Sequence, residues 1–161
     1  MLRRLFISTA VLALLAATGA ASAYDEGLAE SYAKLFKPVV GAKAGKAIHF
    51  MSPKAFLDKV KSGAPIITLD IRTPAEAAVF TSTVPGSLTI PISELFVPEN
   101  LARVPTDKDV VVLCQSGPMA TAAGTALRHV GFGNVFILKG GYKALSTYLN
   151  AKTANSPALR E

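Results

Sequence analysis

The chain has 161 residues, half of them hydrophobic, and a formal net charge of +6. This length is enough for one compact domain with a core of its own. The charge is modest and no basic run is interleaved with aromatic residues, so the sequence indicates no nucleic-acid partner. One cysteine and two separated histidines, His49 and His129, provide neither an internal disulfide nor a metal-ligand spacing. We therefore expect no metal and no other cofactor.

The first 23 residues have the pattern of a signal peptide. Arg3 and Arg4 precede an apolar run, and Ala21-Ser22-Ala23 matches the small-x-small cleavage pattern. We expect residues 1–23 to be removed, which takes two positive charges from the chain. The mature protein is then expected to be exported, to a bacterial periplasm, without a membrane attachment. An uncleaved anchor is the alternative, although the apolar run is short for a membrane span.

Residues 24–46 are interpreted as an N-terminal helix and a linker. Apolar residues at helical spacing predict a helix over 25–37, and Pro38 ends the run. Small residues dominate 41–46, which we interpret as the linker. The helix either packs on the following domain or docks a partner, and the sequence leaves both open.

Residues 47–150 alternate between short apolar runs and helical patterns. Strands are predicted at 47–50, 65–70, 110–113 and 134–138, and helices at 53–61, 100–103, 119–130 and 142–150. This alternation predicts one α/β domain with a parallel sheet. Residues 151–161 are polar and small, and are expected to form a loose tail.

Two helix starts carry capping signals. Ser52 precedes the helix predicted at 53–61 and is a candidate N-cap. Thr73 and Glu76 have the spacing of a capping box around Pro74, which predicts a strand, a turn and a helix in this part of the chain.

Three polar residues stand at the carboxyl ends of predicted strands: Asp70, Cys114 and Lys139. In an open parallel sheet the working crevice lies beyond these ends. We therefore expect the three side chains to lie near one another, at the edge of the sheet where a ligand would bind.

The only cysteine follows the apolar run Val110-Val111-Val112-Leu113 and precedes a tight loop and a helix. This layout directs loop amides and a helix N-terminus at one sulfur, which favours a thiolate or another anion there. The alternative is that Cys114 is a small buried apolar residue at a strand end, as many free cysteines are.

The loop Cys114-Gln115-Ser116-Gly117-Pro118-Met119-Ala120 resembles the active-site loop of single-domain rhodaneses, sulfurtransferases that carry sulfur as a cysteine persulfide. Other segments fit as well. Asp70-Ile71-Arg72 is similar to the family's Asp-x-Arg segment, Val84-Pro85-Gly86 to its Pro-Gly turn, and Lys139-Gly140-Gly141-Tyr142 to its closing turn. The resemblance covers residues 47–150 and implies a rhodanese-like fold of about five parallel strands flanked by helices on both faces.

The resemblance also implies roles for individual residues. Cys114 would be the nucleophile, and Asp70, Arg72 and Lys139 would support the site. The loop that cradles the persulfide would consist of Gln115, Ser116, Gly117, Pro118, Met119, Ala120 and Thr121.

The chain departs from the family at two positions. Thr83 stands where the family usually has histidine, and Met119 stands where many members have arginine. Arg72, Lys139 and Arg128 are candidates to replace the missing loop cation. The alternative for Arg72 is an ion pair with Asp70 or Glu76, which would make its guanidinium unavailable to a substrate.

The expected activity is the transfer of sulfane sulfur from a small anionic donor, such as thiosulfate, to a thiol or cyanide. Two alternatives stay open: a carrier that delivers persulfide sulfur to a partner protein, and an inactive domain used for binding. Cysteine-dependent phosphatases are excluded, because they need an arginine six residues after the cysteine and Ala120 occupies that position.

Overall fold

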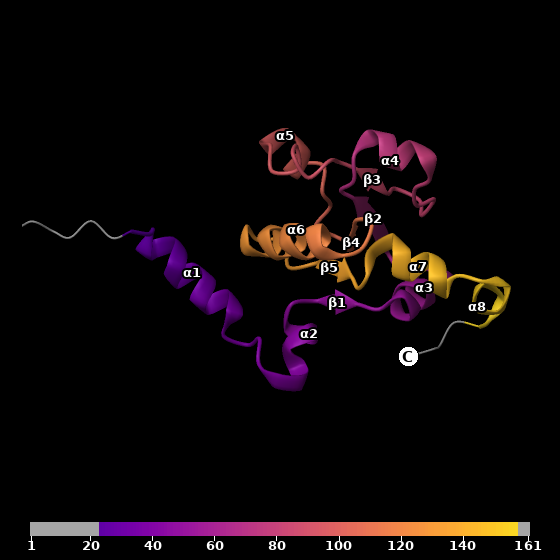
Figure 1. Cartoon of the computed structure of the whole chain (residues 1–161), viewed down its shortest axis with the longest axis horizontal. Helices are drawn as coiled ribbons and strands as arrows, with labels where there is room; N and C mark the ends of the chain where they lie inside the picture. The colour runs from indigo at the N-terminus through magenta and orange to yellow at the C-terminus, as the bar shows by residue number, and fades with distance from the viewer. Residues whose placement is uncertain (1–22, 158–161) are drawn as a thin grey trace, which may run out of the picture.

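The computed structural model describes residues 23–157. Residues 1–22, which hold almost all of the predicted signal peptide, lie outside the described residues, as do residues 158–161. A single parallel sheet forms the centre of the domain, with the strand order β1-β5-β4-β2-β3 (Figure 1). The prediction of about five parallel strands is confirmed.

The strands are short, and the central ones are mostly apolar. Their bounds are β1 Phe50–Met51, β2 Ile66–Asp70, β3 Leu88–Thr89, β4 Asp109–Leu113 and β5 Val135–Leu138. Every residue of β2 is buried, as are the last four of β4. Continuous apolar runs are required here because helices cover both faces of the sheet.

Helices pack on both faces, and alternate residues of β4 separate the two cores. Val110 and Val112 face the core that α6 (Pro118–His129) completes. Val111 and Leu113 face the core that α3 (Pro53–Lys61) and α7 (Gly141–Tyr148) complete. The predicted two-faced helical cover is therefore confirmed.

The capping signals in the sequence are confirmed. The Ser52 hydroxyl accepts the N–H of Ala55 at 3.1 Å and starts α3. Thr73 and Glu76 form a reciprocal capping box at the start of α4 (Pro74–Val79). These caps satisfy N–H groups that a helix start otherwise leaves without partners.

The segment before the sheet was predicted wrongly. Residues 41–46, expected to be a linker, form the 3-10 helix η1 (Gly41–Lys43) and the start of α2 (Ala44–Ala47). The first strand lies at 50–51 rather than at 47–50. The chain changes direction at His49, whose φ of 59° places it in the left-handed region.

Two smaller corrections concern helices. The short helix expected at 100–103 is α5 (Pro98–Leu101), which begins at a proline. Residues 151–155, expected to belong to a loose tail, form α8 (Ala151–Asn155) behind a capping box made by Asn150 and Thr153. The ammonium group of Lys61 donates to the carbonyl oxygens of Thr153 and Ser156, which ties α8 to α3.

The N-terminal helix is confirmed as α1 (Glu26–Phe36), which extends away from the sheet (Figure 1). None of its residues is buried. Tyr32 stacks on His129 of α6 with ring centroids 4.1 Å apart, and the Ser31 hydroxyl lies 3.3 Å from the same imidazole. Within residues 23–157, no helix combines the length and the hydropathy needed to cross a membrane.

Candidate active site

The carboxyl ends of β2, β4 and β5 bring the predicted site residues to one edge of the sheet. Asp70, the last residue of β2, lies opposite Leu113, which directly precedes Cys114. Lys139 follows the last residue of β5, on the other side of β4. The topology therefore gathers Asp70, Cys114 and Lys139 as expected, although only the first two are buried.

Cys114 lies in a loop whose backbone N–H groups point at its sulfur. The sulfur accepts the N–H of Gly117 at 3.2 Å and that of Ala120 at 3.4 Å. Gly117 has a φ of 107°, which a residue with a side chain rarely adopts, and this conformation turns the loop into α6. Cys114 is only 1% exposed, but these two donors distinguish it from a purely apolar buried residue.

Three further amides of the loop are available to a ligand. Among the described residues, the N–H groups of Gln115, Ser116 and Met119 have no hydrogen-bond acceptor. Successive N–H groups that converge at the start of a helix form an anion-binding concavity. The loop can therefore stabilise negative charge on Cys114 and on an atom bonded to it.

The start of α7 holds the cysteine loop through the carbonyl oxygens of the loop. The N–H of Tyr142 donates to the carbonyl oxygen of Cys114 at 2.9 Å, and the N–H of Lys143 donates to that of Gln115 at 2.9 Å. Gly141 makes this contact close, because a Cβ there would collide with the Cys114 carbonyl oxygen. With its carbonyls turned toward α7, the loop presents its amides to the sulfur.

Thr121 plays a different part from the one predicted. Its N–H and its hydroxyl both donate to the carbonyl oxygen of Gly117, at 2.9 and 3.0 Å. Neither group is directed to the sulfur, because the first turn of α6 uses both. Thr121 therefore fixes the shape of the loop and does not contact the sulfur.

Arg72 is occupied by Asp70, so the ion-pair alternative is the right one. Its guanidinium donates to both carboxylate oxygens, with Nη2 2.7 Å from Oδ2, and both side chains are 1% exposed. The rings of Phe80 and Tyr142 stack on the guanidinium, with centroids 4.4 and 4.0 Å from Cζ. The hydrogen bond that Arg72 donates to Asp70 raises the pKa of the guanidinium further. Arg72 is therefore not available to bind a substrate anion.

The same cluster fixes the segment that follows α4. The Tyr142 hydroxyl donates to Asp70 at 3.1 Å and accepts the N–H of Ser82 at 3.0 Å. Arg72 donates to the carbonyl oxygen of Phe80 at 2.6 Å. Burial raises the pKa of Tyr142, so the hydroxyl stays protonated at neutral pH. Thr83, at the family's usual histidine position, is exposed.

The other two candidate cations differ in position. Arg128 donates to the carbonyl oxygen of Ala47 at 3.0 Å, which lies away from the cysteine loop. Its Nε is buried and has no partner within the described part of the chain. Lys139 is exposed, and no described carboxylate lies within ion-pair distance of its ammonium group.

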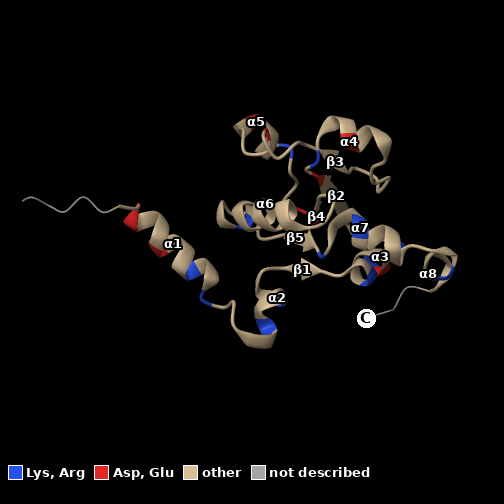
Figure 2. Cartoon of the chain, in the orientation of Figure 1, with Lys and Arg blue, Asp and Glu red and all other residues tan. Residues whose placement is uncertain are grey.

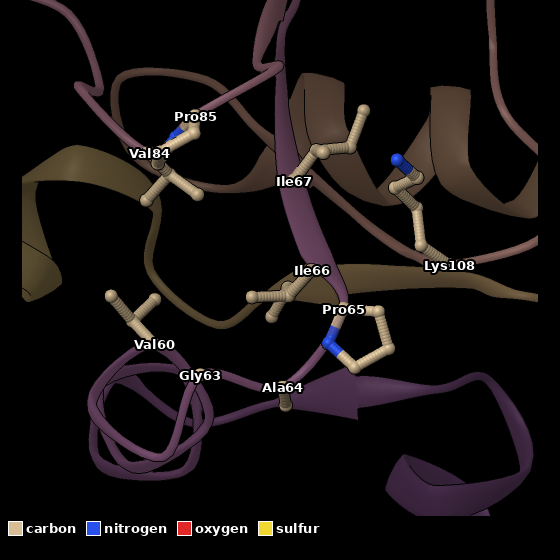
Figure 3. A pocket seen from close by; sticks show the side chains of 9 residues that line it. All are labelled: Val60, Gly63, Ala64, Pro65, Ile66, Ile67, Val84, Pro85 and Lys108. Carbon is tan, nitrogen blue, oxygen red and sulfur yellow. The ribbon is translucent and has the colours of Figure 1, made fainter.

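A cavity of about 360 Å³ lies at the opposite end of the sheet, where β2 begins (Figure 3). Val60, Ile66 and Val84 point into one space, and Lys108 lies across β2 from them. Because the cavity adjoins the amino ends of the strands, it is separate from the cysteine loop. Among residues 23–157, no three His, Cys, Asp or Glu side chains cluster to hold a metal.

This topology, with a cysteine held by backbone amides between β4 and α6, defines an open α/β domain with a single-cysteine site at the carboxyl edge of its parallel sheet. Comparison with known proteins gives the family. Residues 52–147 match the model of the rhodanese-like domain. The chain therefore belongs to the rhodanese-like domain family.

Individual relatives agree with this assignment. A sulfurtransferase of Allochromatium vinosum is 37% identical over 76 residues, which are 47% of this chain and 67% of the relative. The probable adenylyltransferase/sulfurtransferase MoeZ of Mycobacterium tuberculosis is 30% identical over 94 residues, which are 58% of this chain but only 24% of that protein. These relatives support sulfurtransferase activity in general.

The human single-domain sulfurtransferase TSTD1 supports the fold. It is 25% identical in sequence and superimposes with a TM-score of 0.54. The match covers 63% of this chain and 97% of that chain. The shared part is therefore a complete domain of the neighbour, while this chain has additional residues.

Proposed function

We propose that the protein transfers sulfane sulfur from thiosulfate, or a similar small anionic donor, to a thiophilic acceptor through a persulfide on Cys114. The observation that carries this proposal is the pair of N–H groups, from Gly117 and Ala120, that the sulfur of Cys114 accepts. They stabilise a thiolate, which is the form of cysteine that acts as a nucleophile.

The proposed first half-reaction loads the enzyme. The Cys114 thiolate attacks the outer sulfur of thiosulfate, the sulfur–sulfur bond of the donor breaks, and sulfite leaves with the electron pair. We expect the transferred sulfur to be held by the same loop, in which the N–H groups of Gln115, Ser116 and Met119 have no acceptor among the described residues. These donors are suited to the charge that the persulfide carries.

The proposed second half-reaction returns the enzyme to its starting state. A thiolate or cyanide attacks the outer sulfur, the bond between the two sulfurs breaks, and the electron pair returns to Cys114. One thiol therefore suffices, and the reaction is expected to show ping-pong kinetics.

Intact mass spectrometry tests this proposal. We expect the mature protein to gain the mass of one sulfur atom with thiosulfate and to lose it with cyanide, and Cys114→Ser to gain none. Loading by a polysulfide but not by thiosulfate would contradict the proposed enzyme and favour a persulfide carrier that serves a partner protein. No adduct from either donor, with a reduced thiol, would leave a domain used for binding.

We also propose that residues 1–23 direct export to a bacterial periplasm and are then cleaved. The support is the sequence pattern alone: two arginines, an apolar run and Ala21-Ser22-Ala23. N-terminal sequencing of the protein from a periplasmic fraction should give Tyr24 as the first residue. Recovery of the full-length chain from the membrane fraction would overturn this proposal.

A further inference from the structure

A shallow, open groove of about 650 Å³ adjoins the cysteine loop. The helix α7 supplies most of its wall, through Lys143, Ala144, Thr147 and Tyr148. Pro53 at the start of α3, Gly140, and Ser116 of the cysteine loop also line it. We call this open depression the α7 groove.

The α7 groove and the cysteine loop share backbone contacts. Ser116, two residues after Cys114, belongs to both. The N–H of Lys143 is bonded to the Gln115 carbonyl oxygen at 2.9 Å. Gly117 and Gly140 pack so closely that a Cβ on Gly117 would lie 3.3 Å from the Gly140 nitrogen. The groove therefore directly borders the loop that carries Cys114.

The groove carries one charge, and it is positive. Lys143 is the single charged residue of α7, coloured blue in Figure 2, and no acidic residue lines the groove. Lys143 is exposed, and no carboxylate in the described ranges lies within ion-pair distance of it. Arg72 is paired with Asp70, and Met119 brings no charge to the loop. Within the groove, recognition of an anionic group therefore falls to Lys143, because the exposed Lys139 is not among the lining residues.

We infer that the α7 groove binds the non-reacting part of the sulfur acceptor, and that this acceptor is a small thiol with an apolar body and a carboxylate that pairs with Lys143. The inference rests on the proposed function. The acceptor thiolate attacks the outer sulfur of the Cys114 persulfide, and the bond between the two sulfurs breaks. The electron pair goes to Cys114, and the outer sulfur leaves bonded to the acceptor.

The test compares two thiols that differ in charge: N-acetylcysteine and its methyl ester. The protein is first loaded with thiosulfate or polysulfide and its mass is verified. Discharge rates are then measured at equal thiolate concentrations. Lys143→Met should lower the preference for the carboxylate over the ester by about two- to fivefold, the range of one exposed ion pair. Discharge by the ester should not change.

Two variants control for other effects. Lys108→Met removes the same charge at the opposite end of the sheet and should keep the preference of the parent protein. Lys143→Arg should restore most of it. An equal loss of preference in Lys108→Met, or no loss in Lys143→Met, would overturn the inference.

A binding measurement separates this inference from the proposed function. N-acetylmethionine carries the same carboxylate but no reactive thiol, so it needs no persulfide. It should shift the amide NMR signals of Lys143, Ala144 and Thr147 more strongly than its methyl ester does. Successful loading without these shifts would overturn the proposed role of the groove and leave the proposed function intact. Shifts without any loading would overturn the proposed function and leave the groove as an anion site.

Discussion

Tyr142 holds two parts of the site with two different groups. Its backbone N–H donates to the Cys114 carbonyl oxygen, and its hydroxyl connects Asp70 with the N–H of Ser82. The first contact shapes the cysteine loop, and the second fixes the segment after α4. A substitution that removes only the hydroxyl therefore separates the two roles.

We expect Tyr142→Phe to lower the free energy of unfolding by about 1–3 kcal/mol, because a partly buried N–H and a buried carboxylate each lose a partner. The rate of persulfide loading should change by less than about twofold, because the backbone bond to Cys114 remains. Urea unfolding and timed mass spectra measure both. Tyr148→Phe, whose hydroxyl has no hydrogen bond among the described residues, is the matched control. A large loss of loading in Tyr142→Phe, but not in Tyr148→Phe, would contradict the separation of the backbone and hydroxyl roles of Tyr142.

His49 makes stability depend on pH. Its Nδ1 lies 3.1 Å from the Val135 carbonyl oxygen, and its ring stacks on Phe136. Burial, followed by the nearby Arg128, lowers the pKa of His49 below its usual 6.5, although the Val135 carbonyl and Asp109 oppose this shift. The folded state therefore prefers the neutral ring. As the pH falls below 6.5, the unfolded chain takes up the proton first and stability decreases.

The measurement is urea unfolding at pH 7.5, 6.5 and 5.5 for the parent chain and for His49→Asn. Asparagine tolerates the left-handed backbone at this position and does not titrate. We expect the stability difference between the two proteins to shift in favour of the variant as the pH falls. A difference that stays constant over this range would contradict the role of His49.

At the scale of elements, α6 approaches β5 closely because of one glycine. A Cβ on Gly124 would lie 2.5 Å from Cγ1 of Ile137, which is fully buried. Gly124→Ala gains about 1 kcal/mol of helix propensity, but overpacking of this kind costs about 1–3 kcal/mol. We expect net destabilisation in thermal or urea unfolding.

The neighbouring helix α2 provides a matched control for this prediction. Gly45 is also helical, and a Cβ there would meet its nearest atom at an ordinary 3.8 Å. Gly45→Ala should therefore be neutral or stabilising. Ile137→Ala should reduce the cost of Gly124→Ala in the double variant, because the two substitutions act at one contact. Additive costs would show that the contact is not the cause.

Elements with local signals were predictable from the sequence. Two helices begin at the caps Ser52 and Thr73, and one strand is the apolar run before Cys114. Each of these signals involves only residues that are neighbours in the sequence. The strand predicted at 47–50 was wrong because Ala47 ends a helix and His49 adopts a left-handed conformation. Nothing in the local pattern of that run indicates such a turn.

The contacts that join distant segments were not predictable in this way. The sequence left open whether Arg72 binds a substrate anion or forms an ion pair. The rings of Phe80 and Tyr142, which stack on its guanidinium, show how it is buried. Likewise, the sequence identified Lys139-Gly140-Gly141-Tyr142 only as a turn, and did not indicate that α7 would hold the carbonyl oxygen of Cys114. Lys143 was not singled out, because its position beside the loop follows from tertiary packing.

At the scale of the whole molecule, α1 contributes little to the stability of the domain. It buries no residue, and Tyr32 and Ser31 contact α6 at His129. We expect a chain that begins at residue 38 to unfold within about 1 kcal/mol of the mature protein, because one stacked pair is worth about that much. Its persulfide loading should be unchanged. A loss of several kcal/mol in urea unfolding would show that α1 belongs to the folded core.

The position of β5 in the sheet has a consequence for folding. This strand comes last in the sequence but is inserted between β1 and β4, and α7, which holds the cysteine loop, follows it. The two halves of the sheet are therefore joined only when β5 has paired with both of its neighbours. We expect the cysteine loop to reach its final shape late in folding, because the N–H groups that hold its carbonyl oxygens come from the helix after β5.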